Sequence, residues 1–341
     1  MQQALYDANY GYYMQPENPI NRDFITAPEL SPALAYACAI AWQKLYNIDQ
    51  NLILCELGPG SGKLTKAVLE YLQEWQVLPA EIWLIELNAH RRSQQQQLLS
   101  ELPQSLYKRC RWFEQIPQQP WQGLLLANEI LDAQPFALVQ RKDNAWQELT
   151  VTKANGKFAW QQRSIPTKLK PLLPQGDFHD GYCTEIFPKT ADFIKQTTEN
   201  LVQGAVIFID YGYTHNEYYH EQRYMGTSSL FANANKPKTE LFISPGSNDI
   251  TAHVDFTLVA KALNYSDFNI AGYCTQSQFL IQTNAHEHLL NLSGISYAKA
   301  CMAYKQLMFG MGEVFKVMLA SKNARALEQW LCEFGVDRLG L

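Results

Sequence analysis

The chain has 341 residues, of which 47% are hydrophobic and 18% are charged. A chain of this length can bury enough apolar surface for one elaborated domain or for two ordinary ones. It carries 28 Lys and Arg against 33 Asp and Glu, a formal net charge of −5. This composition lacks the basic excess that nucleic-acid binding requires, so no nucleic-acid partner is expected.

The seven cysteines are widely spaced and form no CxxC pair, so the sequence predicts neither a disulfide framework nor a cysteine zinc site. His215, Glu217 and His220 follow the spacing HxExxH instead of HExxH, and no metal site is predicted there either. No apolar run is long enough to span a membrane. The first residues lack the basic start and apolar centre of a signal peptide. We therefore expect a cytoplasmic protein without a membrane span or a metal.

Residues 1–30 are aromatic and rich in proline, and we expect an irregular N-terminal segment there. Residues 32–46 are expected to form a helix capped by Ser31. Short buried strands then alternate with helices, which is typical of a parallel sheet covered on both faces. The expected strands lie at 52–57, 82–86, 109–113, 123–127 and 205–210, with helices at 63–75 and from residue 89 between them.

Residues 136–163 differ from this pattern because apolar and polar side chains alternate around turns such as Asn155-Gly156, which predicts a β-meander. A long stretch at 211–252 has little periodicity and is expected to be a functional loop. Further elements are expected at 255–263 (helix), 268–275 and 313–321 (strands) and 324–334 (helix). The fold prediction is an α/β core over 31–322 with a mostly parallel, seven-stranded sheet, insertions at about 136–180 and 211–252, and a C-terminal helix within 323–341.

The strongest chemical signal is the segment from Glu56 to Gly62, ELGPGSG, between an expected strand and an expected helix. Gly58, Gly60 and Gly62 allow a tight turn and close approach of a ligand to the main chain. The helix that follows presents unpaired N–H groups, which favour a negatively charged ligand group. The alternative is an ordinary tight turn between a strand and a helix.

The spacing of the loop discriminates among ligands. A P-loop would need Ser or Thr after Lys63, where Leu64 stands, and a dinucleotide loop would need a third glycine at Lys63 or Thr65. The observed GxGxG spacing is better suited to S-adenosylmethionine (SAM), which has no pyrophosphate. Glu56, Gly58, Gly60 and Gly62 are therefore candidate cofactor-binding residues.

Glu86 ends the next expected strand, one strand–helix–strand unit after the loop. A right-handed crossover places that strand beside the first, so its carboxylate lies at the ligand-binding edge of the sheet. There it could accept hydrogen bonds from both hydroxyls of a ribose. The alternative is a surface acid that caps the helix starting at Ala89.

A third group of polar residues follows the expected strand at 123–127. Asn128 is a candidate for binding the amino-acid part of the cofactor, and Glu129 and Asp132 are candidates for facing a substrate. For each acid alone, a solvated or helix-capping role is the alternative.

With these residues assembled, the chain resembles the MidA family of SAM-dependent methyltransferases. The segments that carry the resemblance are ALYD at 4–7, YGYY at 10–13, DFITAPELS at 23–31, ELGPGSG at 56–62, NEILDA at 128–133, IDYG at 209–212 and DITAHVDF at 249–256. The resemblance implies a class I, Rossmann-like methyltransferase fold with SAM as cofactor. The mitochondrial branch of the family is associated with arginine methylation on a respiratory complex I subunit. A protein substrate, which could be a respiratory complex subunit, is therefore the expected partner.

The leading functional prediction is a SAM-dependent protein arginine methyltransferase. Because arginine is a cation at physiological pH, carboxylates at the site would offset its repulsion from the sulfonium. Two alternatives remain open, which are an assembly factor that binds SAM with little catalysis and a nicotinamide-dependent Rossmann oxidoreductase.

The substrate side is expected to include the segment DITAHVDF. One interpretation makes Glu129, Asp132, His253 and Asp255 the acceptor pocket, with His253 helping to remove the proton after transfer. The other makes Asp249 or Thr251 the N-cap of the following helix and His253 a buried hydrogen-bonding residue.

Overall fold

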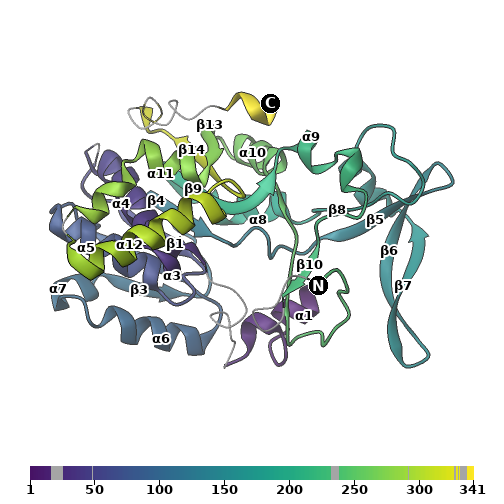
Figure 1. Ribbon diagram of the computed structural model, residues 1–341, viewed down its shortest axis with the longest axis horizontal. Coiled ribbons are helices and arrows are strands. Elements are labelled where there is room, and N and C mark those ends of the chain that lie inside the picture. The colour runs from purple at the N-terminus through teal and green to yellow at the C-terminus, as the bar shows by residue number, and fades with distance from the viewer. Residues whose placement is uncertain are drawn as a thin grey trace. The chain divides into compact units, whose positions relative to one another are not determined.

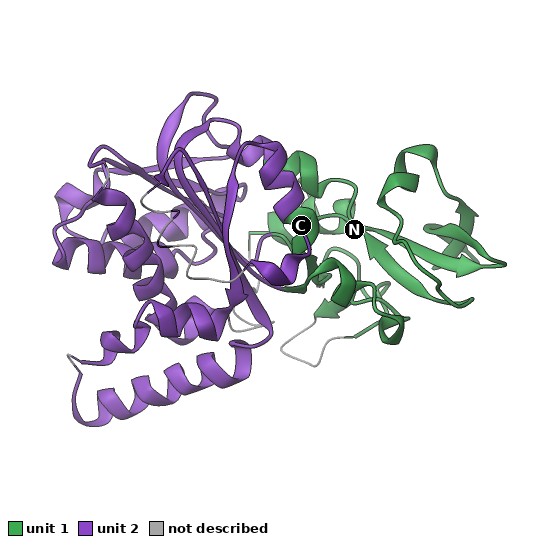
Figure 2. Cartoon of the chain, turned by 90° about the horizontal axis from the view of Figure 1, so that it is seen from above, with its two compact units in different colours: residues 1–24, 131–194, 212–259 green, residues 25–130, 195–211, 260–341 purple. Residues whose placement is uncertain are grey.

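The chain divides into two compact units in the computed structural model, which describes residues 1–16, 26–47, 49–231, 238–290, 292–325, 328, 330 and 336–341 (Figure 2). Unit 1 comprises Met1–Phe24, Leu131–Ile194 and Gly212–Val259. Unit 2 comprises Ile25–Ile130, Lys195–Tyr211 and Ala260–Leu341. The chain therefore passes between the units several times, and most of both predicted insertions belongs to unit 1.

The sheet of unit 2 has seven strands in the order β13-β14-β9-β4-β1-β2-β3 (Figure 1). These strands are β1 (Ile53–Leu57), β2 (Glu81–Ile85), β3 (Cys110–Phe113), β4 (Trp121–Asn128), β9 (Leu201–Tyr213, whose last two residues belong to unit 1), β13 (Asn269–Thr275) and β14 (Phe315–Lys322). An eighth strand, β12 (Val254–Asp255), pairs parallel with the last two residues of β9. Neighbouring strands from β9 to β3 are parallel, and β14 is antiparallel to both of its neighbours. The predicted α/β fold with a mostly parallel sheet is confirmed, and the short strand β12 adds an eighth strand to the seven predicted.

One face of this sheet forms the main core because alternate strand residues point to the same side. Leu54 of β1, Leu84 of β2, Leu126 of β4 and Ile207 of β9 all belong to one buried cluster. The cluster also takes in the helices α4 (Ala33–Tyr46) and α5 (Lys63–Glu74), the latter through Leu64, Val68 and Leu72. The spacing of those three residues is the stripe from which the sequence predicted this helix.

The other helices of unit 2 are shorter or carry fewer buried residues. They are α3 (Ala27–Leu30), α6 (Ala89–Leu99), α7 (Gln104–Tyr107), α11 (Gln276–Gln282), α12 (Gly294–Gln306) and the helical turns at Ala285–Leu289, Leu307–Met311 and Asp337–Leu339. Two helices, α8 (Thr190–Thr198) and α10 (Phe256–Tyr265), begin in unit 1 and end in unit 2. Most of the closing helix predicted at 324–334 lies outside the described residues.

Unit 1 is built around a four-stranded antiparallel sheet in the order β7-β6-β5-β8. Its strands are β5 (Ala137–Lys142), β6 (Ala145–Ala154), β7 (Lys157–Ser164) and β8 (Cys183–Ile186), so the predicted β-meander is present and gains a fourth strand. The remaining elements are α1 (Gln2–Tyr6), α9 (His215–Tyr218), β10 (Ser229–Phe231), β11 (Asp249–Thr251), β12 (Val254–Asp255) and helical turns at Tyr12–Met14, Thr167–Leu172 and Glu221–Arg223. The segment predicted as a long irregular loop thus contains several short elements.

Candidate functional site

The register of the sheet in unit 2 brings three predicted site residues to one level. Leu57, the last residue of β1, pairs with Ile85 of β2 and with Ala127 of β4. The residues that come next are Gly58, Glu86 and Asn128. Since the carboxyl ends of parallel strands meet at the same edge, these three positions lie at the edge where open α/β sheets bind ligands.

The three glycines of the loop have different surroundings. All three have positive φ, at +56° for Gly58, +55° for Gly60 and +84° for Gly62. A Cβ atom at Gly58 would lie 2.3 Å from Cδ1 of Ile130, whereas one at Gly60 would meet no described atom within 4 Å. Gly58 is therefore needed for packing. Gly60 faces open space, which a ligand could occupy.

Gln95 joins the loop to Glu86, and the sequence analysis missed it. Its side chain is fully buried, and its Nε2 donates to the carbonyl oxygen of Gly60 at 2.9 Å and to Oε2 of Glu86 at 3.2 Å. Its Oε1 accepts from Nε1 of Trp112 at 3.1 Å. One amide group therefore fixes Glu86 relative to the glycine loop. A glutamine in a Gln-rich helix gave no signal by which the sequence could have singled it out.

Glu86 is a buried acid, with 6% of its surface exposed. Its Oε1 accepts from the backbone N–H of Asn88 at 2.9 Å. The helix that begins at Ala89 is capped by Asn88, whose Oδ1 accepts from the N–H groups of His90 and Arg91. The alternative of a surface acid capping this helix is therefore wrong. A carboxylate has about four lone-pair sites, so Glu86 keeps acceptor capacity for a ligand.

Glu56 is also buried, and its side chain ties β1 to α5. Its carboxylate accepts from the hydroxyl of Thr65, in the first turn of α5. Burial raises the pKa of Glu56 to about 7, against an ordinary value of 4.5, although the hydrogen bonds from Thr65 act in the opposite direction. These contacts brace the helix behind the loop.

A second acid that the sequence analysis did not assign to the site anchors the loop from outside. Oε1 of Glu29 accepts from the hydroxyl of Ser61 at 2.5 Å, and Oε2 pairs with Nζ of Lys63. Glu29 lies in the segment TAPEL, which the family resemblance had already marked. Its contacts hold the turn between the glycines and α5.

Asn128 and Glu129, at the end of β4, are the third part of the site in unit 2, after the glycine loop and Glu86. Nδ2 of Asn128 donates to Oε1 of Glu129 at 3.0 Å. Oδ1 of Asn128 is buried and has no hydrogen-bond partner among the described residues. Glu129 has a φ of +55°, a strained value for a residue with a side chain, and such strain is concentrated at functional sites. The unpaired acceptor is what a ligand that donates a hydrogen bond would require.

The other three predicted residues, Asp132, His253 and Asp255, belong to unit 1. The carbonyl oxygen of Asp132 accepts from the N–H of Ala252 at 3.1 Å, so Asp132 lies beside the residue that precedes His253. The imidazole of His253 stacks on the ring of Tyr213, with centroids 5.1 Å apart and planes at 8°. Asp132 and His253 are thus brought to one part of unit 1.

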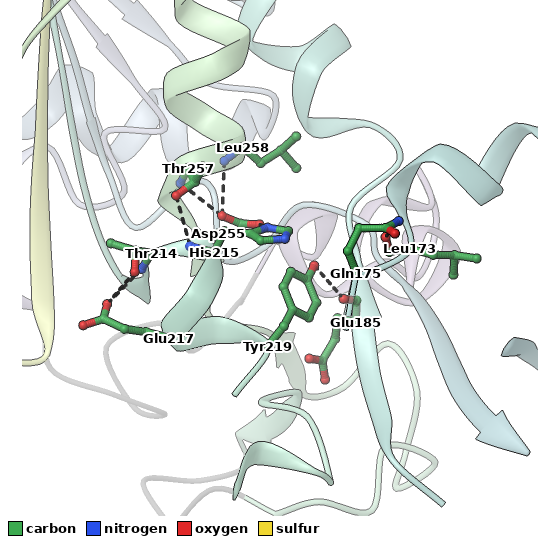
Figure 3. Close-up of polar contacts among 10 residues, drawn as sticks. All are labelled: Leu173, Gln175, Glu185, Thr214, His215, Glu217, Tyr219, Asp255, Thr257 and Leu258. Atoms are coloured by element: carbon green, nitrogen blue, oxygen red, sulfur yellow. Dashed lines mark hydrogen bonds and ion pairs between the residues drawn. The ribbon is translucent and has the colours of Figure 1, made fainter. Parts of the chain in front are cut away.

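Asp255 has different contacts (Figure 3). Its Oδ1 accepts from the N–H groups of Thr257 at 3.0 Å and Leu258 at 3.1 Å, which makes Asp255 the cap of α10. Its Oδ2 pairs with Nδ1 of His215 at 2.9 Å. The cap predicted at Asp249 or Thr251 is wrong because Asp255 supplies it, and Asp249 accepts from the hydroxyl of Tyr13 at 2.9 Å.

Glu185 is a buried acid of unit 1 that the sequence analysis missed. Its side chain has no exposed surface, and its carboxylate accepts from the hydroxyl of Tyr218 at 2.8 Å and from the N–H groups of Thr227 at 3.0 Å and Ser228 at 2.7 Å. The hydroxyl of Thr227 in turn accepts from the N–H of His253 at 3.1 Å. Glu185 therefore holds the segment that positions His253. Figure 3 shows its carbonyl oxygen accepting from Tyr219 as well.

The described residues contain no cluster of three His, Cys, Asp or Glu side chains that could hold a metal ion. Within the HxExxH segment, Glu217 accepts from the N–H of Thr214 at 3.0 Å and closes a capping box at the start of α9. None of the helices in the described part of the chain combines the length and the apolar character needed to cross a bilayer.

Two solved structures are similar to this chain over most of its length. Both are crystal structures of proteins from Burkholderia thailandensis that belong to one superfamily. One is bound to S-adenosyl-homocysteine and matches with a TM-score of 0.86 and 29% identity, over 95% of this chain and 86% of that one. The native structure matches with a TM-score of 0.87 and 30% identity over the same shares.

Curated relatives include "Protein arginine methyltransferase NDUFAF7, mitochondrial" of Danio rerio, 25% identical over 82% of this chain and 71% of the relative. The homologue from Drosophila melanogaster is 26% identical over 86% of this chain and 72% of the relative. Because these relatives are named as mitochondrial proteins, the predicted cytoplasmic location is wrong and is withdrawn.

The family model described as "Putative S-adenosyl-L-methionine-dependent methyltransferase" matches residues 33–274, which is more than half of the chain. The match includes the glycine loop, Glu86, Asn128 and every predicted acceptor residue. The chain therefore belongs to this family, and the resemblance to the MidA family is confirmed. It is a SAM-dependent methyltransferase with the class I fold.

Proposed function

We propose that this methyltransferase binds SAM in unit 2 and transfers its methyl group to an arginine of a protein substrate. The observation that carries the cofactor assignment is the bridge from Gln95 to both Gly60 and Glu86. It fixes a buried carboxylate beside a loop position that has open space in front of it. The acceptor assignment is supported by the relatives named as protein arginine methyltransferases.

Each cofactor residue has a distinct task in this proposal. Glu86 accepts hydrogen bonds from the ribose hydroxyls of SAM, and Oδ1 of Asn128, which has no partner among the described residues, accepts from the ammonium of its methionine part. Gly60 leaves room for the ligand. Glu56, Gly58 and Gly62 support the loop from behind, through the Thr65 hydrogen bond, the contact with Ile130 and the turn into α5.

Bound SAM supplies an electrophilic methyl group on a sulfonium. The residues proposed to handle the acceptor are Glu129, Asp132, His253 and Asp255. Carboxylates offset the repulsion between the guanidinium and the sulfonium and can hold the planar guanidinium by paired hydrogen bonds. The imidazole of His253 accepts the proton that the methylated nitrogen loses. Asp255 has the weakest support of the four, because its two oxygens already cap α10 and bind His215.

The test is transfer of an isotope-labelled methyl group from SAM to the proteins of a lysate, followed by acid hydrolysis and identification of the labelled amino acid. The proposal predicts label in methylarginine. It also predicts that His253→Ala and Glu129→Gln keep the SAM affinity of the wild type and lose most of the turnover. Label in another amino acid would overturn the arginine assignment, and wild-type turnover in both variants would overturn the acceptor residues.

The protein substrate that we propose to test first is a subunit of a respiratory complex, because the resemblance to the mitochondrial branch points there. If the wild type binds SAM and transfers no label to any protein, an assembly factor with little catalysis becomes the better interpretation. If instead a nicotinamide dinucleotide stabilises the protein against heat and SAM does not, the oxidoreductase alternative is favoured.

A further inference from the structure

The hairpin formed by β6 and β7 presents an unpaired strand edge. β7 is the terminal strand of its sheet, and in the described part of the chain it pairs only with β6 (Figure 1). Its outer edge therefore carries backbone N–H and C=O groups that another strand could use. Such edges bind extended peptides through main-chain hydrogen bonds, with selectivity supplied by alternate side chains.

One face of this hairpin carries three exposed apolar side chains. Val151 lies directly opposite Trp160 in the register, and Phe158 is two residues before Trp160, so the three side chains share a face. The exposed fractions are 52% for Val151, 52% for Phe158 and 42% for Trp160. The ring of Phe242 packs 4.6 Å from that of Trp160 and 6.0 Å from that of Phe158. A contiguous exposed apolar patch of this kind marks a binding surface.

The charge of the hairpin is opposite in sign to that of the whole chain. Residues 145–164 contain Lys153, Lys157 and Arg163 against the single acid Glu148, a net charge of +2, whereas the chain as a whole has −5. Arg163 lies opposite Glu148 in the register. Lys153 and Lys157, near the turn, form no ion pair among the described residues. Lys153, which lies opposite Phe158, is on the aromatic face, and Lys157 is on the other face.

This charge pattern argues against a second copy of the chain as the occupant of the edge. If two β7 strands paired antiparallel about Trp160, Lys157 of each copy would lie opposite Arg163 of the other. Like charges directly opposite each other destabilise a strand pair. A strand of another protein that carries acidic side chains would meet the same two positions favourably.

We propose that the outer edge of β7 binds an extended segment of another protein in which apolar and acidic side chains alternate. The apolar side chains would lie on the face of Phe158 and Trp160. The acidic ones would lie on the opposite face of the added strand, where Lys157 and Arg163 point, because alternate strand residues face opposite sides. This inference does not depend on which residue the enzyme methylates.

The experiment uses the full chain and two fluorescent synthetic peptides, Glu-Val-Glu-Ile-Glu-Val-Glu and Lys-Val-Lys-Ile-Lys-Val-Lys. Fluorescence anisotropy should show that the acidic peptide binds at least about tenfold more tightly than the lysine peptide. Hydrogen exchange should show added protection of backbone amides in β7. Acidic peptides N-methylated on every second residue should lose binding when the methyl groups block the hydrogen-bonding edge.

Matched variants distinguish peptide binding at the edge of β7 from nonspecific binding to the protein surface. Trp160→Ser should weaken binding of the acidic peptide about tenfold or more, and Lys157→Glu, a change at an exposed position, should reduce its advantage over the lysine peptide. Tyr265→Ser, at a tyrosine that is 90% exposed in unit 2, should change neither. Equal affinity for both peptides, or equal losses in Trp160→Ser and Tyr265→Ser, would overturn the proposal. So would a wild-type dimer that Trp160→Ser dissociates, because the occupant would then be a second copy.

Discussion

Glu86 is the residue whose contacts leave the clearest place for a ligand. Its two hydrogen bonds, from Asn88 and Gln95, fix the position of the carboxylate and leave part of its acceptor capacity unused. We expect Glu86→Ala to weaken SAM binding by about 1.5–3 kcal/mol, the range for hydrogen bonds to a charged group. Isothermal titration with SAM measures this directly, and circular dichroism should show an unchanged fold.

The matched control for this prediction is Glu114→Ala. Glu114 follows the neighbouring strand β3, is 69% exposed and pairs with Arg92 at the surface, and exposed pairs contribute little. Its loss should leave SAM affinity unchanged. A less than about twofold loss of affinity in Glu86→Ala would mean that this acid serves only the fold.

Glu56 gives a prediction about pH. Because burial raises its pKa from 4.5 to about 7 in the folded protein, the folded state binds more protons than the unfolded state between these values. Glu56 therefore costs no stability below about pH 4.5, and its destabilising effect grows as pH rises and is complete above about pH 7. Glu56→Gln keeps an acceptor for Thr65 and cannot ionise.

Urea unfolding without added SAM, at about pH 5 and about pH 8, tests this. From the lower to the higher pH, the wild type should lose about 2–3 kcal/mol more of its free energy of unfolding than Glu56→Gln does. Parallel pH dependences in the two proteins would show that Glu56 is ionised at its ordinary pKa in the folded state.

At the scale of elements, the start of α10 depends on one acid. Asp255 accepts from two N–H groups at the first turn of the helix. Asp255→Ala should lower the free energy of unfolding by about 1–2 kcal/mol, whereas Asp255→Asn, which keeps the capping acceptor, should stay close to the wild type. Chemical unfolding of the two variants measures the difference.

The same two variants distinguish the two roles considered for Asp255, as the cap of α10 and as a residue that contacts the acceptor. If Asp255→Asn is as stable as the wild type and has lost methyl transfer, the carboxylate acts on the acceptor and its capping contacts are secondary. Equal stability of Asp255→Ala and the wild type would contradict the capping role itself.

Periodicity predicted the elements that pack against the core and failed for those that do not. The stripe of Leu64, Val68 and Leu72 marked α5 because one face of that helix is buried. By contrast, α12 has no fully buried residue among those described, so its sequence shows no apolar stripe. The elements α9, β10 and β11 have three or four residues each, too few for any period to be read.

For the whole molecule, local patterns predicted the sheet of unit 2 and the hairpins of unit 1, but not how unit 1 is assembled. That unit gathers the N-terminal segment and parts of both insertions. Its assembly rests on contacts between distant residues, such as the hydroxyl of Tyr6 with the carbonyl oxygen of Ala133 and the hydroxyl of Tyr13 with Asp249. Hydrophobic periodicity does not predict contacts between such distant residues. For the same reason, the sequence did not indicate Glu185 as a structural residue of unit 1.

The sequence also predicted only part of the candidate site, namely the residues that stand at the ends of strands. The glycines, Glu86 and Asn128 stood at strand ends, where chemistry gathers in α/β sheets. Gln95 lies in the middle of a helix, and only the fold shows that its amide donates hydrogen bonds to Gly60 and to Glu86.

Titration of the wild type, Gly60→Val and Gly156→Val with SAM shows whether SAM binds in front of Gly60 in unit 2. Both glycines have positive φ, +55° and +79°, and a Cβ at either would meet no described atom within 4 Å. The two substitutions therefore impose similar backbone strain, and only the first places a side chain where the ligand is expected. We expect Gly60→Val to stay folded and to lose SAM binding, while Gly156→Val binds SAM like the wild type. Wild-type affinity in a folded Gly60→Val protein would contradict this expectation.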